Sequence, residues 1–274
     1  MVDELTVIAS SYHRNGYYFP LDAMSSEQAL AYRSQFEAAE REYKDKDPDF
    51  DALVFGHANM VMPFIDEITR LPTVLDPVRA ILGPDVMVWG ANLFIKEAHS
   101  SGYVSWHQDL TYWDLDDVHE VTAWVALSPA TVQSGCMRYV PGTHTQEIAV
   151  HRDTFAKNNQ LSRGQELVVD VNEAEAVDVV LAPGQIALHH GRIFHSSLAN
   201  QTDDRRIGLA IRYISPRMQQ VSGVKTYCTL VSGEDRYGHF HLTETPRGVM
   251  HPTDREMAHR AITAGGKFLF AATC

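Results

Sequence analysis

The chain has 274 residues, a formal net charge of −12, and 45% hydrophobic and 21% charged residues. This length is enough for one large domain with a sizeable core, and the composition is that of an ordinary globular protein. The acidic balance argues against nucleic acid or an anionic membrane surface as the main partner, because both repel negative charge. It says little about a small molecule, which senses only the local field of its binding pocket.

The N-terminal stretch and the cysteines indicate a compartment. No basic segment is followed by an apolar core, and no window approaches the roughly 18 uncharged apolar residues of a membrane span, so neither secretion nor membrane insertion is supported. Cys136, Cys228 and Cys274 are widely spaced and odd in number, which fits reduced thiols better than a disulfide framework. We therefore expect a cytoplasmic protein.

No Ser/Gly/Pro-rich linker, repeat or low-complexity tract interrupts the chain, which predicts a single domain over residues 1–274. Its parts differ in pattern. Residues 1–85, approximately, are expected to be mainly helical, about 86–216 to form a β-rich core, and about 217–274 to form a C-terminal extension without a clear pattern. A homodimer is compatible with the sequence but not required by it.

Three helices are predicted in the first part. Residues 25–44 carry a broken apolar stripe among charged residues, and Ser25 or Ser26 can cap this helix. A second helical zone covers 59–70. A third helix is expected over 76–83, where an Asp-Pro pair provides a cap and a first-turn proline and a glycine ends the helix.

From Val86 onward the pattern changes to short runs rich in Val, Ile, Leu and aromatic residues, separated by Gly, Pro and polar turns. This pattern favours an antiparallel sandwich or barrel. The runs are 87–97, 121–129, 135–144, 178–190 and 205–216. Segment 145–177 is polar and irregular, as expected for an insertion between core strands.

The stretch 106–109, Trp-His-Gln-Asp, places an imidazole and a carboxylate two residues apart. On a strand, residues i and i+2 point to the same face with their roots about 7 Å apart, so His107 and Asp109 can converge on one ion. Such a pair supplies part of the 2-His-1-carboxylate triad, which holds Fe(II) and leaves positions open for oxygen and a co-substrate. The pair could also lie on the surface of an edge strand, so a second histidine has to complete the site.

Three histidines follow the apolar runs of 178–190 and could supply this ligand on composition alone: His189, His190 and His195. We favour His195, because an arginine, Arg206, follows eleven residues later at the start of an alternating strand. A buried arginine near an iron site offers a forked donor to a dicarboxylate co-substrate. Its neighbour Arg205 is the chief rival, because alternation along a strand sends one of the two inward and the other outward.

With these residues, the sequence resembles the phytanoyl-CoA dioxygenase family of Fe(II)/2-oxoglutarate-dependent oxygenases. The resemblance covers most of the chain from about 12 to 215, in the family's order and at about its spacing. The matching segments are YHRNGYYFPL (12–21), WHQDLTYW (106–113), TAWVAL (122–127), GCMRYVPGTH (135–144) and LAPGQIALHHGRIFHSS (181–197), with Asn200 and Arg206. It implies a mainly β fold of the α+β type: a double-stranded β-helix, or jelly-roll, core with N-terminal helices buttressing one sheet.

The resemblance also implies roles for particular residues. The iron ligands would be His107, Asp109 and His195. The contacts to 2-oxoglutarate would be Arg206, selected over Arg205 by the family's spacing, together with Ser197, Trp124 and Asn92.

The implied activity is hydroxylation of a small organic metabolite, using Fe(II), 2-oxoglutarate and O2 and releasing succinate and CO2. The carboxylate of Asp109 favours hydroxylation over halogenation, because related halogenases carry a small residue at this position. Two alternatives stay open: a cupin-like metalloenzyme that is not an oxygenase, and an inactive jelly-roll binding module. The substrate itself is open, because substrate residues lie on loops that vary within such families.

Overall fold

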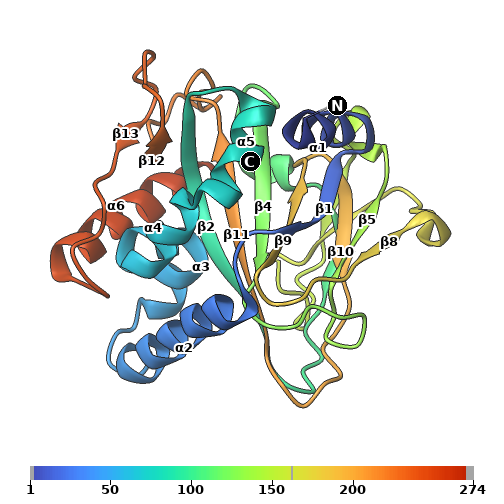
Figure 1. Cartoon of the computed structure of the whole chain (residues 1–274), viewed down its shortest axis with the longest axis horizontal. Helices are drawn as coiled ribbons and strands as arrows, with labels where there is room; N and C mark the ends of the chain where they lie inside the picture. The colour runs from blue at the N-terminus through green and yellow to red at the C-terminus, as the bar shows by residue number, and fades with distance from the viewer. Residues whose placement is uncertain (1–2, 162, 270–274) are drawn as a thin grey trace.

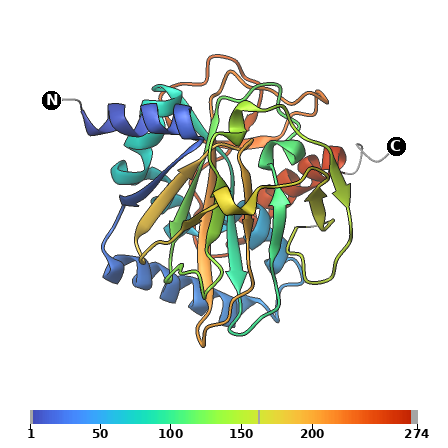
Figure 2. The same cartoon turned by 90° about the vertical axis from the view of Figure 1, so that its right-hand side faces the viewer.

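The computed structural model describes residues 3–161 and 163–269. Two facing sheets form its centre, and helices cover the outer face of the larger one (Figure 1; Figure 2). The larger sheet has the strand order β1 (Tyr17–Asp22), β9 (Gln185–His189), β4 (Glu120–Ala126), β11 (Arg206–Ile214), β2 (Val86–Lys96), β12 (Tyr227–Ser232) and β13 (His241–Leu242). The smaller sheet has the order β3 (Val104–His107), β10 (Phe194–Ser197), β5 (Met137–Val140) and β8 (Val177–Val179).

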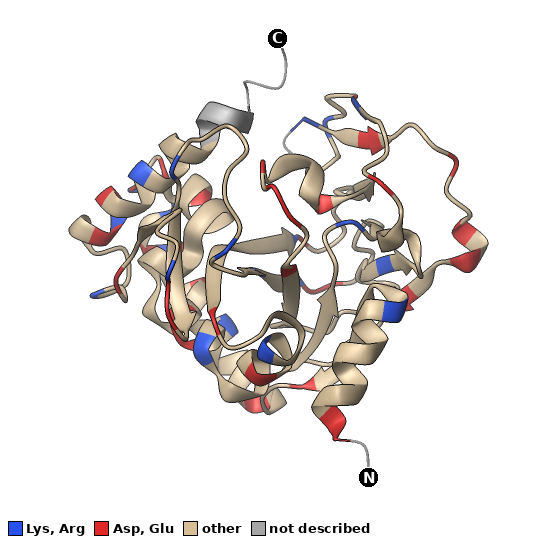
Figure 3. Ribbon diagram, turned by 90° about the horizontal axis from the view of Figure 1, so that it is seen from above, with Lys and Arg blue, Asp and Glu red and all other residues tan. Residues whose placement is uncertain are grey.

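The helices buttress the larger sheet, as expected from the sequence. They are α1 (Glu4–Asn15), α2 (Ser26–Tyr43), α3 (Phe50–Val61), α4 (Pro63–Arg70), α5 (Pro72–Leu82) and α6 (Pro252–Leu269). A short hairpin of β6 (His151–Asp153) and β7 (Gln165–Leu167) lies within the irregular segment 145–177. Lys, Arg, Asp and Glu lie mainly on the outer helices and loops, whereas the strands in the middle carry few of them (Figure 3). The predicted jelly-roll core with buttressing helices is confirmed.

Strand β11 shows how the two layers divide the side chains. All nine of its residues are buried, because the strand lies between the helices and the smaller sheet. Its odd-numbered side chains, such as Leu209 and Ile211, join the core beneath the helices, whereas Ala210 joins the cluster between the two sheets. Successive side chains of a strand point to opposite faces, so Arg206 and Arg212 both project to the same side as Ala210, between the sheets.

The helix predictions were partly right. The helix at 25–44 is confirmed as α2, and the side chain of Ser25 caps it by accepting a hydrogen bond of 3.1 Å from the backbone N–H of Gln28. The zone 59–70 is instead divided between α3 and α4. The division falls at Met62, which is extended because Pro63 follows it.

The helix expected over 76–83 begins earlier than predicted. Its first-turn proline is Pro72, not Pro77, which lies inside α5. An interior proline removes one backbone hydrogen bond. The helix continues through it because Val74, Pro77 and Val78 are all buried against neighbouring elements.

Two further features bear on the expected environment of the protein. Cys136 and Cys228 are buried free thiols, and Cys136 packs in the cluster between the sheets; Cys274 lies outside the described residues. Within the described part of the chain, no helix has both the length and the apolar character needed to cross a membrane.

Candidate active site

Strand register brings the two predicted histidines together. His107 on β3 and His195 on β10 are direct partners in the antiparallel pairing of these strands. Directly opposite residues of an antiparallel pair project from the same face of the sheet. The centroids of the two imidazole rings are 3.9 Å apart.

Asp109 joins the histidines from a turn, not from a strand as the sequence suggested. Strand β3 ends at His107, and Asp109 begins the short 3-10 helix η1 (Asp109–Tyr112). Its Oδ1 nevertheless lies 3.4 Å from Nε2 of His107 and 3.8 Å from Nε2 of His195. One ligand atom from each of the three buried residues lies within 4.8 Å of the others.

Backbone hydrogen bonds set the tautomers of both histidines. Nδ1 of His107 donates to the carbonyl oxygen of Ser105 at 2.9 Å, and Nδ1 of His195 donates to that of Ile193 at 3.0 Å. A carbonyl can only accept, so the proton is on Nδ1 and the Nε2 lone pair is left facing Asp109. This is the arrangement by which metal-binding histidines are usually oriented.

The protonation states also suit a cation. Burial lowers the pKa of His195 well below its ordinary value, which keeps this imidazole neutral. Burial alone would raise the pKa of Asp109, but its close contacts with the surrounding imidazoles, His107 and His189 first, hold it well below its ordinary value. Two imidazoles with free Nε2 lone pairs and one carboxylate are the donor set that suits Fe(II) with open positions.

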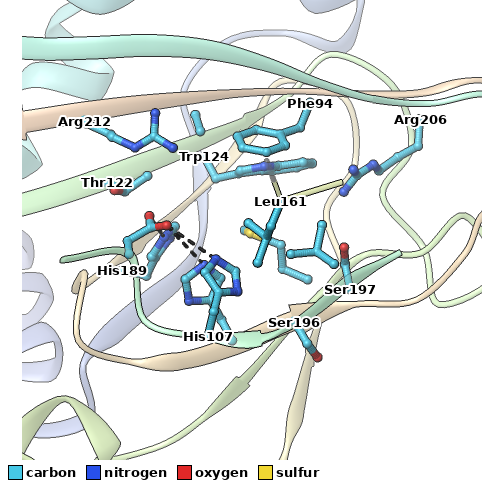
Figure 4. A pocket seen from close by; sticks show the side chains of 15 residues that line it. Phe94, His107, Thr122, Trp124, Leu161, His189, Ser196, Ser197, Arg206 and Arg212 are labelled. Carbon is cyan, nitrogen blue, oxygen red and sulfur yellow. Dashed lines mark ion pairs between the residues drawn. The ribbon is translucent and has the colours of Figure 1, made fainter. Parts of the chain in front are cut away.

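These three residues form part of the wall of a cavity between the two sheets (Figure 4). The rest of the wall is mostly apolar, with two arginines, Arg206 and Arg212, at its ends. The other lining residues are Phe94, Val104, Thr122, Trp124, Met137, Leu161, His189, Ser196, Ser197 and Ala210.

Arg206 lies at one end of the cavity without a carboxylate partner in the described part of the chain. Its side chain is buried, its Nη1 donates to the carbonyl of Gly135 at 3.3 Å, and its Nε has no hydrogen-bond partner there. Burial lowers its pKa to about 10, so the group is still a cation at neutral pH. A buried cation in this state is suited to bind an anion.

Trp124 fixes the orientation of this guanidinium. The guanidinium carbon of Arg206 lies 5.3 Å from the centroid of the Trp124 ring. Gly208, on the same face of β11, makes room for the indole, because a Cβ at this position would lie 1.8 Å from Cζ2 of Trp124. The sequence prediction placed Trp124 near the co-substrate but did not recognise the need for this glycine.

Lys96 is a residue whose importance the sequence did not reveal. It is the cross-strand partner of Arg206, is fully buried, and donates from Nζ to Oγ of Ser197 at 2.7 Å and to the carbonyl of Leu198. Burial, followed by the charge of Arg206, lowers the pKa of Lys96 to about 6. Because Ser197 accepts this bond, its own hydroxyl hydrogen is free to donate into the cavity.

Asn92 is the one predicted site residue that the structure does not bring to the cavity wall. It lies on β2, where its Nδ2 donates to the carbonyl of Phe55 and its Oδ1 accepts from Nη1 of Arg212. Both ends of its amide are therefore engaged within the protein. Its contact with 2-oxoglutarate stays a prediction.

The adjacent histidines His189 and His190 face opposite ways. His189 lines the cavity, where its Nδ1 accepts from the hydroxyl of Tyr139 at 2.9 Å, while His190 lies 3.4 Å from the buried Glu120. Alternation along the strand predicts only that the two side chains point to opposite faces. His189 is the one that faces inward, because it pairs directly with Thr122 on β4, which also lines the cavity.

Arg212 at the other end of the cavity was also missed. The available signal was its even spacing from Arg206 along one strand, which puts both on the same face. The sequence could not show that Arg212 is buried without a partner carboxylate among the residues that the structure describes, because this depends on contacts with distant elements.

A jelly roll that holds two histidines and a carboxylate beside a buried arginine, with no carboxylate partner in the described part of the chain, defines a class of protein, the 2-oxoglutarate-dependent non-haem iron oxygenases. The family model of phytanoyl-CoA dioxygenase (PhyH) matches residues 12–208. The chain belongs to this family.

The relatives agree with this assignment. A solved structure of ThoJ, described as a non-heme monooxygenase, is 33% identical with a TM-score of 0.87, over 96% of this chain and 97% of ThoJ. Phytanoyl-CoA dioxygenase domain-containing protein 1 of Rattus norvegicus is 30% identical over 55% of this chain and 53% of its own length, so the matched part spans about half of this curated relative. CytC3 with Fe(II) and alpha-ketoglutarate shares the fold, at 20% identity and a TM-score of 0.67 over 91% of this chain and 96% of CytC3.

Proposed function

We propose that this protein hydroxylates a small organic metabolite in a reaction that consumes O2 and 2-oxoglutarate and releases succinate and CO2. His107, Asp109 and His195 would hold the iron, since their three donor atoms converge and their tautomers leave lone pairs free. The bound iron and 2-oxoglutarate supply the oxidising chemistry. The free thiols Cys136 and Cys228 support the expectation of a reducing, cytoplasmic setting.

The chain's own residues orient the co-substrate and exclude water. Arg206 would bind the far carboxylate of 2-oxoglutarate as a forked donor, with the hydroxyl of Ser197 as a further donor. Trp124 supports this guanidinium from one side. Phe94 and Leu161 add apolar walls between the arginine and the metal ligands (Figure 4).

The observation that carries this proposal is the pairing of a three-residue metal site with an unpaired cation in a single cavity. A cupin-like metalloenzyme without 2-oxoglutarate has no need for Arg206, whose burial without a carboxylate costs stability. An inactive binding module has no need for histidine lone pairs aimed at a carboxylate. The presence of both features favours the oxygenase.

Succinate formation tests the proposal directly. Protein reconstituted anaerobically with Fe(II) is mixed with 2-oxoglutarate, air and a panel of small metabolites, beside Arg206→Ala and His107→Ala variants. We expect iron-dependent succinate that rises with one class of metabolite and is absent in both variants. Turnover that persists in Arg206→Ala would favour the cupin-like alternative, and a wild-type protein that binds no iron would leave only the inactive module.

A further inference from the structure

Arg212 is a second buried arginine of the cavity that the proposed function leaves unused. It lies six residues beyond Arg206 on the same face of β11, a distance of about 20 Å along an extended strand. The two guanidinium groups lie at opposite ends of the cavity, with Phe94 and Trp124 between them (Figure 4). Arg206 therefore lies at the end proposed to bind 2-oxoglutarate, and Arg212 lies at the opposite end.

The surroundings of Arg212 hold the guanidinium in place without neutralising it. Its side chain is only 9% exposed, its Nη1 donates to Oδ1 of Asn92, and it lies 5.4 Å from the centroid of the Trp113 ring. Its Nε has no hydrogen-bond partner, and no carboxylate lies within ion-pair distance among residues 3–161 and 163–269. The forked edge of the group is thus partly free.

The two nearest acidic groups are committed elsewhere. Asp109 faces the three histidines of the metal site. Glu120 accepts a hydrogen bond of 2.6 Å from the N–H of Gly191, and burial raises its pKa well above the ordinary value, which favours its neutral form. Both carboxylates act on Arg212 through their charges, but among the described residues neither forms an ion pair with it or occupies its free edge.

Charge balance then indicates what is missing, if the proposed function holds. The charges of Fe(II) and Arg206 would be balanced by Asp109 and the two carboxylates of 2-oxoglutarate. The remaining uncompensated charge in the cavity would be that of Arg212. A buried arginine retains its charge and is stabilised when a carboxylate binds its fork in a bidentate manner.

We propose that Arg212 anchors the substrate, and that the substrate is a small organic acid with one carboxylate and an apolar body. The carboxylate binds the free edge of Arg212, and the apolar body lies along Thr122 and Ala210 towards the metal ligands. Asn92 acts as a positioning residue that holds Nη1 and turns the remaining donors to the cavity. This assignment rests on the proposed function and specifies its substrate class.

Binding to the loaded protein tests this assignment without knowledge of the natural substrate. Full-length protein is loaded anaerobically with Fe(II) and 2-oxoglutarate, and the visible absorption of the chelate gives the Kd for 2-oxoglutarate. A panel of aliphatic and aromatic monocarboxylic acids, each paired with its uncharged methyl ester, is then added, and the perturbation of this absorption reports binding. The variants are Arg212→Gln, Arg212→Lys and, as control, Arg217→Gln, whose exposed side chain pairs with Asp117.

We expect at least one acid to bind the wild type and the control more tightly than its ester. Arg212→Gln should weaken this binding about 10- to 100-fold, the loss expected for a charge-assisted hydrogen-bonded pair, with little change in the Kd for 2-oxoglutarate. Arg212→Lys keeps the charge but not the forked donor, so its affinity for the acid should lie between those of the wild type and Arg212→Gln. This variant tests the assignment if Arg212→Gln does not fold.

Three outcomes would overturn the assignment. No preference of the wild type for any acid over its ester would exclude a carboxylate substrate at this position. If Arg212→Gln bound the acids as tightly as the wild type, Arg212 would not be the anchor of the carboxylate. A large loss of 2-oxoglutarate affinity in Arg212→Gln would assign the residue to the co-substrate instead. An absence of the chelate absorption in the wild type would mark failure of the proposed function itself, which is a separate result.

Discussion

The metal site and the Arg206 end of the cavity differ in how completely the protein pairs its own charged groups. At the metal site, Asp109 is surrounded by His107, His189 and His195, and backbone carbonyls fix the tautomers of His107 and His195. At the other end, Arg206 and Lys96 are buried together without a carboxylate among the described residues. The chain alone orients the three side chains of the metal site, whereas Arg206 is completed only by an anion.

Removal of a metal ligand should have the largest effect. We expect His107→Ala to weaken Fe(II) binding by more than the roughly 10- to 100-fold that loss of an outer hydrogen-bonding partner of a metal ligand costs, and to abolish succinate formation. Anaerobic titration with Fe(II) measures the affinity. The exposed His241 provides the control His241→Ala, and equal affinities of the two variants would contradict the assignment of the site.

Removal of Arg206 should affect the binding of 2-oxoglutarate without affecting the binding of Fe(II). We expect Arg206→Gln to weaken 2-oxoglutarate binding about 100-fold while Fe(II) affinity is unchanged. The free energy of unfolding of the protein without ligands should not fall, because the variant removes an unpaired buried charge. Urea unfolding with and without 2-oxoglutarate measures both effects, and a strong loss of stability without ligand would show that Arg206 already has its partner.

A smaller effect is expected from Gly208→Ala, which leaves every charged group in place. The added methyl group would overlap Trp124 and displace the ring that supports Arg206. We expect about tenfold weaker 2-oxoglutarate binding with normal Fe(II) binding, the consequence of a misplaced donor. Gly248→Ala is the matched control, because a Cβ there meets nothing within 4 Å. An unchanged affinity of Gly208→Ala for 2-oxoglutarate would show that Trp124 does not position Arg206.

The smallest effect concerns Lys96 and pH. Its pKa of about 6 lies below the ordinary value of 10.5, so between these pH values the unfolded chain binds more protons than the folded one. The stability of the protein without ligands should therefore rise with pH across this window and fall as pH drops towards 6. Lys96→Met should flatten this rise and increase Tm near neutral pH by about 2–4 °C for each kcal/mol gained.

Thermal unfolding at several pH values measures this slope. Lys225→Met, at an exposed position, should leave the slope as in the wild type. Equal slopes for the wild type and Lys96→Met would show that burial does not lower the pKa of Lys96.

The sequence predicted the groups that chemistry specifies and missed those that packing specifies. His107, Asp109, His195 and Arg206 were predicted because their residue types and spacing indicate a metal and a dicarboxylate, and the structure brings them to one cavity. The sequence did not predict Lys96 as a site residue, because a lysine at the end of a strand is usually solvated. Only the pairing of β2 with β11 reveals its burial beside Arg206.

The fold shows the same division. Helix α2 was predicted almost to its ends, since a serine cap and an apolar stripe are local signals. The start of α5 was misplaced, because its interior Pro77 imitates a first-turn proline. Helix α6 carried no clear signal in a C-terminal part that the sequence left unassigned.

The most direct test of the account is a crystal structure of the protein loaded anaerobically with Fe(II) and 2-oxoglutarate. We predict iron bonded to Nε2 of His107, Nε2 of His195 and a carboxylate oxygen of Asp109, with the far carboxylate of 2-oxoglutarate on Arg206 and the edge of Arg212 still open. A metal bound outside this triad, or a co-substrate carboxylate on Arg212 with Arg206 left unpaired, would contradict the account.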